Sequence, residues 1–234
     1  MNKTSHRLLN HKTTQVTNLR QWGSFILGFT AIIFSSCAGS YNFIVPRTLN
    51  YTNKTEYEGV EMLYRYNVQK EIGNKKYARK ERKKNTKLVA IKFTNNTEID
   101  IRFSELEFYS DNEQLQPLPF AETHKRLKQS VPIYFLYFLL TPINGMGLDK
   151  NGKATKFVPI GVIAGPSLGL LNIASAKSAN KKFHLELMRN DLSNALIAKG
   201  ETVHALVAFE GLQNDVALTI KTKNTTAKKL TEDE

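Results

Sequence analysis

The sequence contains one cysteine, Cys37, among its 234 residues. A single cysteine excludes any disulfide within the chain, so this fold is not built on a disulfide framework. Exported proteins usually pair their cysteines, so a lone one in an exported chain calls for a different explanation.

The first 36 residues contain no acidic side chain and no apolar run long enough to cross a membrane. Their apolar core, Phe25 to Phe34, has ten residues, whereas a spanning helix needs about 20. A basic arm precedes this core, and the small residues Ser35 and Ser36 follow it. The arm carries Lys3, Arg7, Lys12 and Arg20. This order predicts a signal peptide over residues 1–36 that directs export and is then removed.

The tetrapeptide Phe34-Ser35-Ser36-Cys37 resembles the lipobox of bacterial lipoproteins, in which a large aliphatic residue and two small residues precede the cysteine. The resemblance implies cleavage before Cys37 and lipidation of its thiol. It also implies attachment to the outer or inner membrane in the cell envelope of a Gram-negative bacterium. The alternative is a buried thiol at the end of an uncleaved helix, because unoxidised cysteine is among the most buried residue types.

Motifs of the common enzyme classes are absent from the sequence. No Gly-rich phosphate loop follows a strand pattern, and no Gly-x-Ser-x-Gly elbow occurs. His124, His184 and His204 follow the signal, and their spacing matches no metal-ligand motif. Glu105 and Glu107 would point the same way on a strand, but such a pair is more often a solvated face than a glycosidase site. We therefore expect no catalytic residue, metal or cofactor. A hydrolase that gathers His184, His204 and an acid from distant strands is the alternative.

Acidic residues are too few to balance the basic ones, and the formal net charge is +12. Loss of the four basic residues of the signal lowers it to +8. The charge is densest between Lys70 and Lys87, where mutual repulsion predicts a solvated hairpin end or a flexible loop. A nucleic-acid site would need interleaved aromatic side chains, and Tyr77 is the only one, so we expect no nucleic-acid partner. The alternative is contact with an anionic surface, either lipid head groups or polysaccharide. The candidate contact residues are Lys75, Lys76, Arg79, Lys80, Arg82, Lys83 and Lys84.

Short alternating segments at both ends of the remaining chain predict an antiparallel β-fold. Strands are expected over residues 57–68, 87–93, 99–103, 106–109, 201–211 and 215–223. The Asn-rich turn at 94–97 and the turn Gln213-Asn214 predict hairpins between their neighbouring strands. One face of the strand 201–211 is expected to carry Val203, Ala205, Val207 and Phe209. The pattern resembles the immunoglobulin-like modules of exported bacterial proteins, which implies a mainly β sandwich.

Two uncharged runs, 130–148 and 157–176, interrupt this pattern. A hydrophilic connector from Asp149 to Lys156, with three Lys and one Asp, separates them. Four prolines oppose a spanning helix in either run: Pro132, Pro142, Pro159 and Pro166. We expect a helix from Pro166 to about Met188 and an insertion that packs on the sandwich. Its buried stripe would hold Leu171, Ser175, Ala179, Phe183 and Leu187.

A membrane-contacting hairpin and a partner-binding surface are the alternatives for this insertion. Gly161, Gly165 and Gly169 have the small-xxx-small spacing of helices that approach closely in lipid, although Pro166 interrupts that triplet.

These patterns divide the chain into a signal peptide (1–36), a lipidated polar tether (37–55), a sandwich (56–223) with an insertion (122–190), and a polar tail (224–234). The composition of the tether predicts that it buries little. The predicted function is that of a membrane-anchored envelope lipoprotein acting as a binding or structural assembly module. Its candidate partners are the membrane, through lipid at Cys37, and an envelope protein, anionic lipid or polysaccharide. A membrane-contacting hairpin protein that joins an envelope complex, and an envelope hydrolase, are the alternatives.

Overall fold

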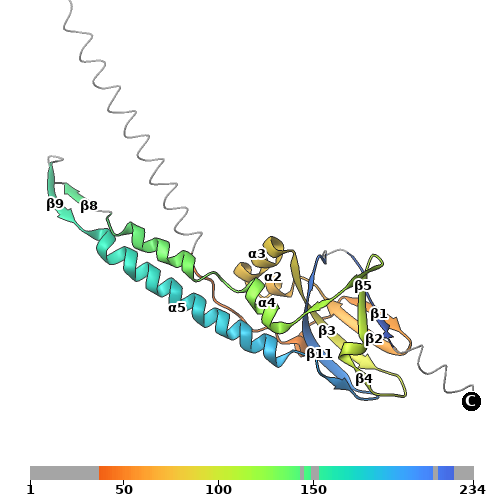
Figure 1. Cartoon of the computed structure of the whole chain (residues 1–234). Coiled ribbons are helices and arrows are strands. Elements are labelled where there is room, and N and C mark those ends of the chain that lie inside the picture. The colour runs from red at the N-terminus through yellow and green to blue at the C-terminus, as the bar shows by residue number, and fades with distance from the viewer. Residues whose placement is uncertain (1–36, 143–144, 149–152, 213–215, 224–234) are drawn as a thin grey trace, which may run out of the picture. The chain divides into compact units, whose positions relative to one another are not determined.

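The computed structural model describes residues 37–142, 145–148, 153–212 and 216–223 (Figure 1). The chain divides into two units, Met1–Cys37 and Ala38–Glu234. The elements named here belong to the second unit. The predicted signal peptide (1–36), the Gln213-Asn214 turn and the polar tail (224–234) lie outside the described residues.

A five-stranded antiparallel sheet forms the centre of this unit, with the strand order β1-β2-β3-β11-β7. The strands are β1 (Asn53–Tyr57), β2 (Val60–Arg65), β3 (Thr86–Asn95), β11 (Thr202–Glu210) and β7 (Pro117–Leu118). The register of β3 and β11 runs from Thr86↔Glu210 to Thr94↔Thr202, so these two strands form the long middle of the sheet. The predicted alternation is confirmed in β2, where Val60, Met62 and Tyr64 are buried on one face.

Two smaller antiparallel sheets pack on one face of the central sheet. One has the strand order β12-β5-β6, and the other pairs β10 with β4. Their strands are β4 (Ile101–Arg102), β5 (Leu106–Ser110), β6 (Glu113–Leu115), β10 (Leu196–Ile197) and β12 (Leu218–Thr222), and the 3-10 turn η2 (Phe103–Glu105) joins β4 to β5. The ring of Phe108 lies 6.1 Å from that of Phe93 and 5.1 Å from that of Phe209, centroid to centroid, so one apolar core joins the layers.

Helices cover the other face of the central sheet (Figure 1). They are α2 (Val68–Glu71), α3 (Lys75–Lys84), α4 (Phe120–Leu127) and the C-terminal half of α5 (Ile160–Arg189), together with the 3-10 turn η1 (Pro46–Thr48). Leu88 and Ala90 of β3 pack against these helices, whereas Val89 and Ile91 face the smaller sheets. Both faces of β3 are therefore buried, which explains its nearly continuous apolar sequence.

This helical layer corrects the expected fold class. The chain is a mixed α and β protein with antiparallel sheets, not a mainly β protein. The expected face of β11 is confirmed, with Ala205, Val207 and Phe209 buried and Val203 half-buried in the core between the sheets. Its opposite face, Leu206 and Ala208, is buried under the helices, a second burial that period-two alternation does not reveal.

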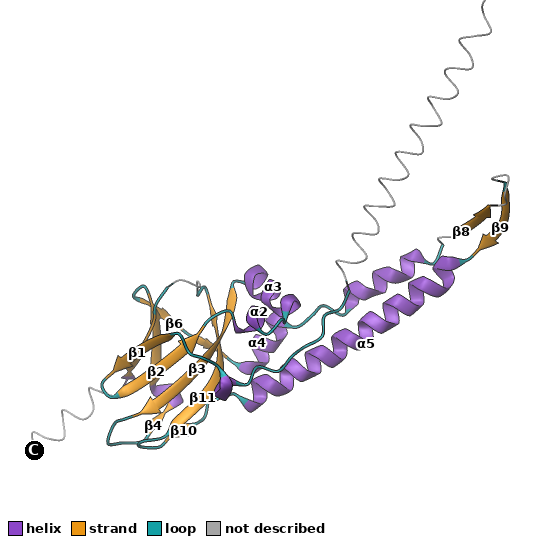
Figure 2. Cartoon of the chain, turned by 180° about the vertical axis from the view of Figure 1, so that it is seen from behind, coloured by secondary structure: helices purple, strands orange, loops and turns teal. Residues whose placement is uncertain are grey.

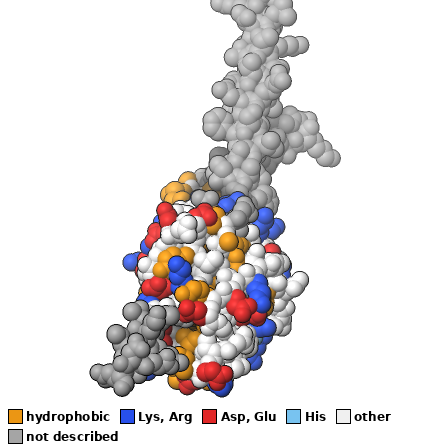
Figure 3. All heavy atoms as spheres, turned by 90° about the vertical axis from the view of Figure 1, so that its right-hand side faces the viewer, with side chains coloured by type: hydrophobic (Ala, Val, Ile, Leu, Met, Phe, Trp, Pro, Cys, Tyr) orange, Lys and Arg blue, Asp and Glu red, His pale blue; other side chains and the backbone are white. Residues whose placement is uncertain are grey.

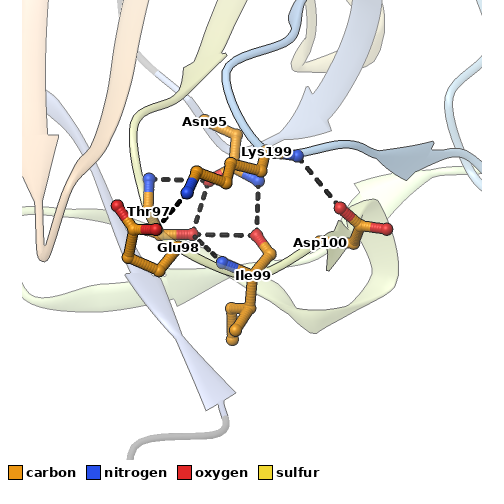
Figure 4. A network of polar contacts seen from close by, with 6 residues as sticks. All are labelled: Asn95, Thr97, Glu98, Ile99, Asp100 and Lys199. Carbon is orange, nitrogen blue, oxygen red and sulfur yellow. Dashed lines mark hydrogen bonds and ion pairs between the residues drawn. The ribbon is translucent and has the colours of Figure 1, made fainter.

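The predicted hairpin at 94–97 is wrong. β3 pairs with β2 and β11, whereas β4 pairs with β10 in another sheet, so the chain crosses between layers here. Asn95 organises the crossing. Figure 4 shows its side-chain amide donating to the Ile99 carbonyl (2.8 Å) and its side-chain oxygen accepting from Thr97. The same amide also donates to the Ile197 carbonyl (3.0 Å). The expected pairing of 201–211 with 215–223 is wrong for the same reason, because β12 pairs with β5.

The basic run is helical, not the predicted hairpin end or flexible loop. α3 places Tyr77 and Glu81 four residues apart, and both are buried. Two inward side chains one turn apart give the helix a packed face despite its charge density.

The insertion contains a helical hairpin that only partly packs on the sheet. The 3-10 segment η3 (Pro132–Leu140) lies beside the N-terminal half of α5, and the strands β8 (Gly145–Leu148) and β9 (Ala154–Val158) pair at its end (Figure 2). Helix α5 begins at Ile160, not at the predicted Pro166, and continues through that proline. Of the predicted stripe, Ala179, Phe183 and Leu187 are buried, whereas Leu171 and Ser175 are exposed.

Candidate functional site

The two helices of the insertion meet through glycine. We call η3 together with residues 160–172 of α5 the apolar hairpin. A Cβ atom on Gly165 would lie 2.8 Å from the Tyr137 carbonyl oxygen, and one on Gly169 would lie 2.8 Å from Cε2 of Phe138. Both distances are shorter than real Cβ contacts. A larger residue at Gly165 would press on the backbone of η3, whereas one at Gly169 would displace the Phe138 ring.

Large apolar side chains of the apolar hairpin point outward. Nine of the fifteen large apolar side chains that are exposed in the described part of the chain belong to it, so the exposure is concentrated and not scattered. Leu139 is 71% exposed and Ile163 is 72% exposed. The other seven are Ile133, Phe135, Leu136, Phe138, Val162, Leu170 and Leu171. Soluble monomers rarely expose a continuous apolar patch of this kind.

The apolar hairpin has no charged face to balance its apolar one. No Asp, Glu, Lys or Arg occurs in residues 130–148 or 157–176. In contrast, the view of the β layers in Figure 3 shows Lys and Arg interspersed with Asp and Glu and only scattered apolar side chains. Helices that lie flat on a membrane surface carry a strongly polar face. The apolar hairpin therefore has the surface of a helix pair that is surrounded on all sides.

The expectation that the insertion is buried on the sheets is wrong for the apolar hairpin. Its inward side chains, Tyr134 and Tyr137, are buried, and the large aliphatic ones face away. The C-terminal half of α5 does pack on the sheet, with Phe183 fully buried. In the part of the chain that the structure describes, no helix combines the length and the apolar character needed to cross a membrane.

Residues 38–44, which we call the strap, connect Cys37 to the helical layer. The Ala38 amide donates to Oδ1 of Asn172 at 2.5 Å, and the Gly39 amide donates to Oε1 of Gln129 at 3.0 Å. The Gln129 side-chain amide returns a hydrogen bond to the Gly39 carbonyl at 2.7 Å. Cys37, which is exposed, is therefore one peptide bond away from a residue fixed to the middle of α5.

The second half of the strap binds two further buried side chains. Asn74 accepts from the Asn42 amide and donates to the Asn42 carbonyl, both at 2.8 Å. Glu186 accepts from the Tyr41 hydroxyl and from the Ile44 amide. Tyr41 and Ile44 are each 2% exposed, so the prediction of a tether that buries little is wrong over this stretch.

Burial raises the pKa values of two groups that hold the strap, the Glu186 carboxyl and the Tyr41 hydroxyl. It raises the pKa of Glu186 to about 7, although the hydrogen bonds from Tyr41 and Ile44 act in the opposite direction. It also raises the pKa of the Tyr41 hydroxyl, with a further contribution from the nearby Glu186 carboxyl. Asn180 completes the network, accepting from the Gln129 amide at 2.8 Å and from the Tyr77 hydroxyl at 3.0 Å.

The seven basic residues predicted as an anionic contact all lie on α3. Lys75, Arg79, Arg82, Lys83 and Lys84 are exposed, and Lys76 and Lys80 are half-buried. Partial burial and the neighbouring Lys84 and Lys83 lower the pKa of Lys80. The helix thus gathers the predicted residues on one surface.

The residues considered for catalysis do not form a site. The His184 ring lies 4.9 Å from the His124 ring, whereas His204 lies on β11 with its ring 6.3 Å from that of Tyr51. No described carboxylate hydrogen-bonds to any of these histidines. Glu105 belongs to η2 and accepts from the Arg102 amide, and Glu107 on β5 accepts from the Tyr109 hydroxyl, so the two do not share one strand.

Neither a search for metal ligands nor comparison with known proteins assigns a site to this chain. Among the described residues, no group of three His, Cys, Asp or Glu side chains is placed to hold a metal ion. Comparison of the chain with protein-family models, curated proteins and solved structures gives no match.

Sequence reasoning missed the strap and its buried partners. The available signal was the cluster Tyr41, Phe43, Ile44 and Val45, which interrupts an otherwise polar stretch. A second signal was the set of polar residues on the inward side of α5, namely Asn172, Asn180 and Glu186.

Proposed function

We propose that this protein is a lipid-anchored envelope protein whose apolar hairpin enters the bilayer to which Cys37 attaches it. One observation carries the proposal: the apolar hairpin is packed with glycine inside and Leu, Ile and Phe outside, the reverse of a water-soluble helix pair. The strap supports the proposal further, because it holds the residue after Cys37 against Asn172, where the apolar hairpin begins.

The energetics favour two attachments acting together. Full burial of a large apolar side chain contributes about 1.5–3 kcal/mol, and these nine are exposed by between 36% and 72%, so each has about 1 kcal/mol to gain in lipid. Their sum, about 10 kcal/mol before ordering costs, is comparable to one acyl chain at about 0.8 kcal/mol per methylene. One acyl chain alone holds a protein only marginally, and a second attachment makes anchoring stable.

The rest of the chain forms the soluble module in this proposal. We assign residues 1–36 to a removed signal, Cys37 to the lipidation site, and the location to the envelope of a Gram-negative bacterium. The two packed layers of antiparallel strands support an immunoglobulin-like relationship, in which the β layers bind a partner or hold an assembly together. The exposed basic residues of α3 are a candidate contact for anionic lipid or polysaccharide.

Depth-dependent fluorescence quenching tests the proposal. Trp22 is the only tryptophan, so Trp22→Phe with Leu139→Trp creates a single reporter on η3. The full chain, produced in a Gram-negative host and purified from its membranes, is reconstituted into vesicles with brominated acyl chains. We expect strong quenching of this indole. The matched control is Leu196→Trp in the Trp22→Phe background, which places the reporter at a 54% exposed leucine on β10, and it should stay unquenched.

An unquenched reporter on η3 would overturn the bilayer proposal. Together with a continued need for detergent, that outcome would favour the competing interpretation, a hairpin surrounded by a partner protein. The anchor is tested separately: Cys37→Ala should abolish incorporation of labelled fatty acid and accumulate slower-migrating precursor. Equal labelling of this variant would refute lipidation at Cys37.

A further inference from the structure

The exposed surface of α5 changes from apolar to basic along the helix axis. Leu170 is followed on the same stripe by Lys177 and Lys181, and Leu171 is followed on the neighbouring stripe by Lys182. All three lysines are exposed. The polarity is therefore segregated along the axis, with the apolar part first and the basic part after it.

A fourth lysine lies at the same level of the helix. Lys128 is exposed and directly precedes Gln129, whose backbone amide donates to Asn180 and whose side chain binds Gly39. We call Lys128, Lys177, Lys181 and Lys182 the basic collar. None of the four forms an ion pair with another described residue. Acidic neighbours do not neutralise the collar, because Glu81 and Glu186 are buried and Glu122 pairs with Arg126 at 2.7 Å.

The strap begins at this collar. A cleft between the strap and α5 is lined by Ala38, Ser40, Tyr41, Ser175, Ser178 and Lys182. It offers serine hydroxyls and one ammonium group, which are donors that suit a phosphate. The cleft includes Ala38, the residue that directly follows Cys37.

The lengths of the apolar and basic parts of α5 match the hydrocarbon and head-group layers of one bilayer leaflet. Residues 162–171 of α5 span about 14 Å at 1.5 Å per residue, close to one leaflet of a hydrocarbon core about 30 Å thick. Lys177 follows Leu171 by about 9 Å. A hairpin that enters the hydrocarbon thus leaves the collar at the level of the head groups, where lysine stems can extend along the boundary.

We infer that the basic collar and its cleft bind the phosphate head groups of anionic phospholipids. The inference rests on the proposed function, since the lipid anchor at Cys37 and insertion of the apolar hairpin together bring the collar to the head groups. The ligand class follows from charge complementarity: four lysines without ion-pair partners among the described residues attract head groups of net negative charge more strongly than zwitterionic ones, whose net charge is zero. In this inference the collar selects which lipids surround the anchor, and the apolar hairpin sets how deeply the protein enters the bilayer.

Selective quenching separates this inference from the proposed function. A single reporter at the base of the hairpin, Trp22→Phe with Leu171→Trp, is carried on the full lipidated chain. It is reconstituted into mixed phosphatidylglycerol and phosphatidylcholine vesicles, and in each of two series only one of these lipids is brominated. The ratio of quenching in the two series gives the relative association of the anionic lipid with the hairpin base.

We expect the anionic lipid to be favoured at least fivefold, since one basic residue near the surface contributes about that factor. The preference should fall towards one in 0.5 M salt and in Lys177→Gln/Lys181→Gln/Lys182→Gln. The α3 variant Arg79→Gln/Arg82→Gln/Lys83→Gln tests the other candidate lipid contact. The matched control, Arg102→Gln/Lys221→Gln/Lys223→Gln, removes the same charge from exposed positions of the β layers and should keep the preference.

Each other outcome has a definite meaning. Equal quenching by both lipids would overturn the inference and leave insertion of the hairpin intact. Quenching by neither lipid would refute the proposed function itself. A preference that survives in the α5 triple variant and disappears in the α3 triple variant would assign lipid selection to α3 and overturn the collar.

Discussion

Glu186 should make the stability of this protein decrease as the pH rises from acidic to neutral. Burial raises the pKa of its carboxyl from an ordinary 4.5 to about 7 in the folded chain. Between these two values the folded chain holds a proton that the unfolded chain has released, so stability falls with increasing pH. The difference between these two pKa values corresponds to about 3 kcal/mol of stability. The stability that this proton contributes is fully present below about pH 4.5 and is lost as the pH rises through about 7.

Glu81 provides an internal comparison for this prediction. Burial also raises its pKa to about 7, with the Leu88 amide donating to it at 3.1 Å. Glu186→Gln and Glu81→Gln should each reduce the fall by a similar amount, because the amide does not titrate and has nearly the same shape. The lowered pKa values of His124 and His204 act in the opposite direction and are common to all variants. The free energy of unfolding is measured by urea titration of the detergent-solubilised chain at several pH values between 5 and 8, with circular dichroism as the signal. A wild-type stability that is flat or rises over this range, or a Glu186→Gln variant with the full fall, would refute the reasoning.

Two further substitutions test the packing and the layer crossing. Gly165→Val places a side chain against the Tyr137 carbonyl oxygen and should destabilise the pairing of η3 with α5 by about 1–3 kcal/mol. Hydrogen exchange should show faster exchange in η3 with β3 unchanged, whereas Ser167→Val, at an exposed position of the same helix, should leave both unchanged; protected η3 amides in Gly165→Val would contradict this. Asn95→Ala removes the hydrogen bonds to Ile99 and Ile197 and should cost about 2–4 kcal/mol in urea unfolding. Thr202→Ala loses only an exposed bond to Thr94 and should change stability by less than about 0.5 kcal/mol; a similar loss in both variants would show that Asn95 has no special role.

Period-two patterns identified six of the twelve strands in the described part of the chain, but not their partners. Alternation in β2 and β11 depends on one buried face, which the residues themselves report. Pairing depends on where the chain goes next, and a polar turn such as 94–97 suits a hairpin and a crossing between layers equally. The amide of Asn95 decides the matter through carbonyls of two different segments, one of them about a hundred residues away in sequence.

Hydropathy found the insertion and misjudged where its apolar side chains point. The runs 130–148 and 157–176 contain enough apolar residues for a core or for lipid contact, and composition alone does not distinguish the two. The spacing of Gly161, Gly165 and Gly169 carried the distinction, because glycine on the inner stripe places the larger residues outside. Pro166 was given too much weight, since packing of Gly165 and Gly169 on η3 keeps one helix on both sides of it.

Charge and polarity misled the predictions for α3 and the strap in the same way. The polar composition of both segments predicts that they are exposed to solvent. Tyr77 and Glu81 of α3 are nevertheless buried, and so are Tyr41 and Ile44 of the strap. Polar partners that lie far away in sequence make this burial possible, and a local window does not include them.

The strap also sets an order of events during biosynthesis. Its hydrogen-bond partners lie between 30 and 145 residues further along the chain, from Ile72 to Glu186. Contacts of such long sequence separation form late. The segment beginning at Ala38 therefore lacks its partners until Glu186 has been synthesised, and in the proposed function this is the interval in which Cys37 is accessible for processing. Once α5 has folded, Asn172, Gln129 and Glu186 hydrogen-bond to the strap. In the proposed function, the bonds that fix the position of the anchor would therefore also end the interval in which it can be processed.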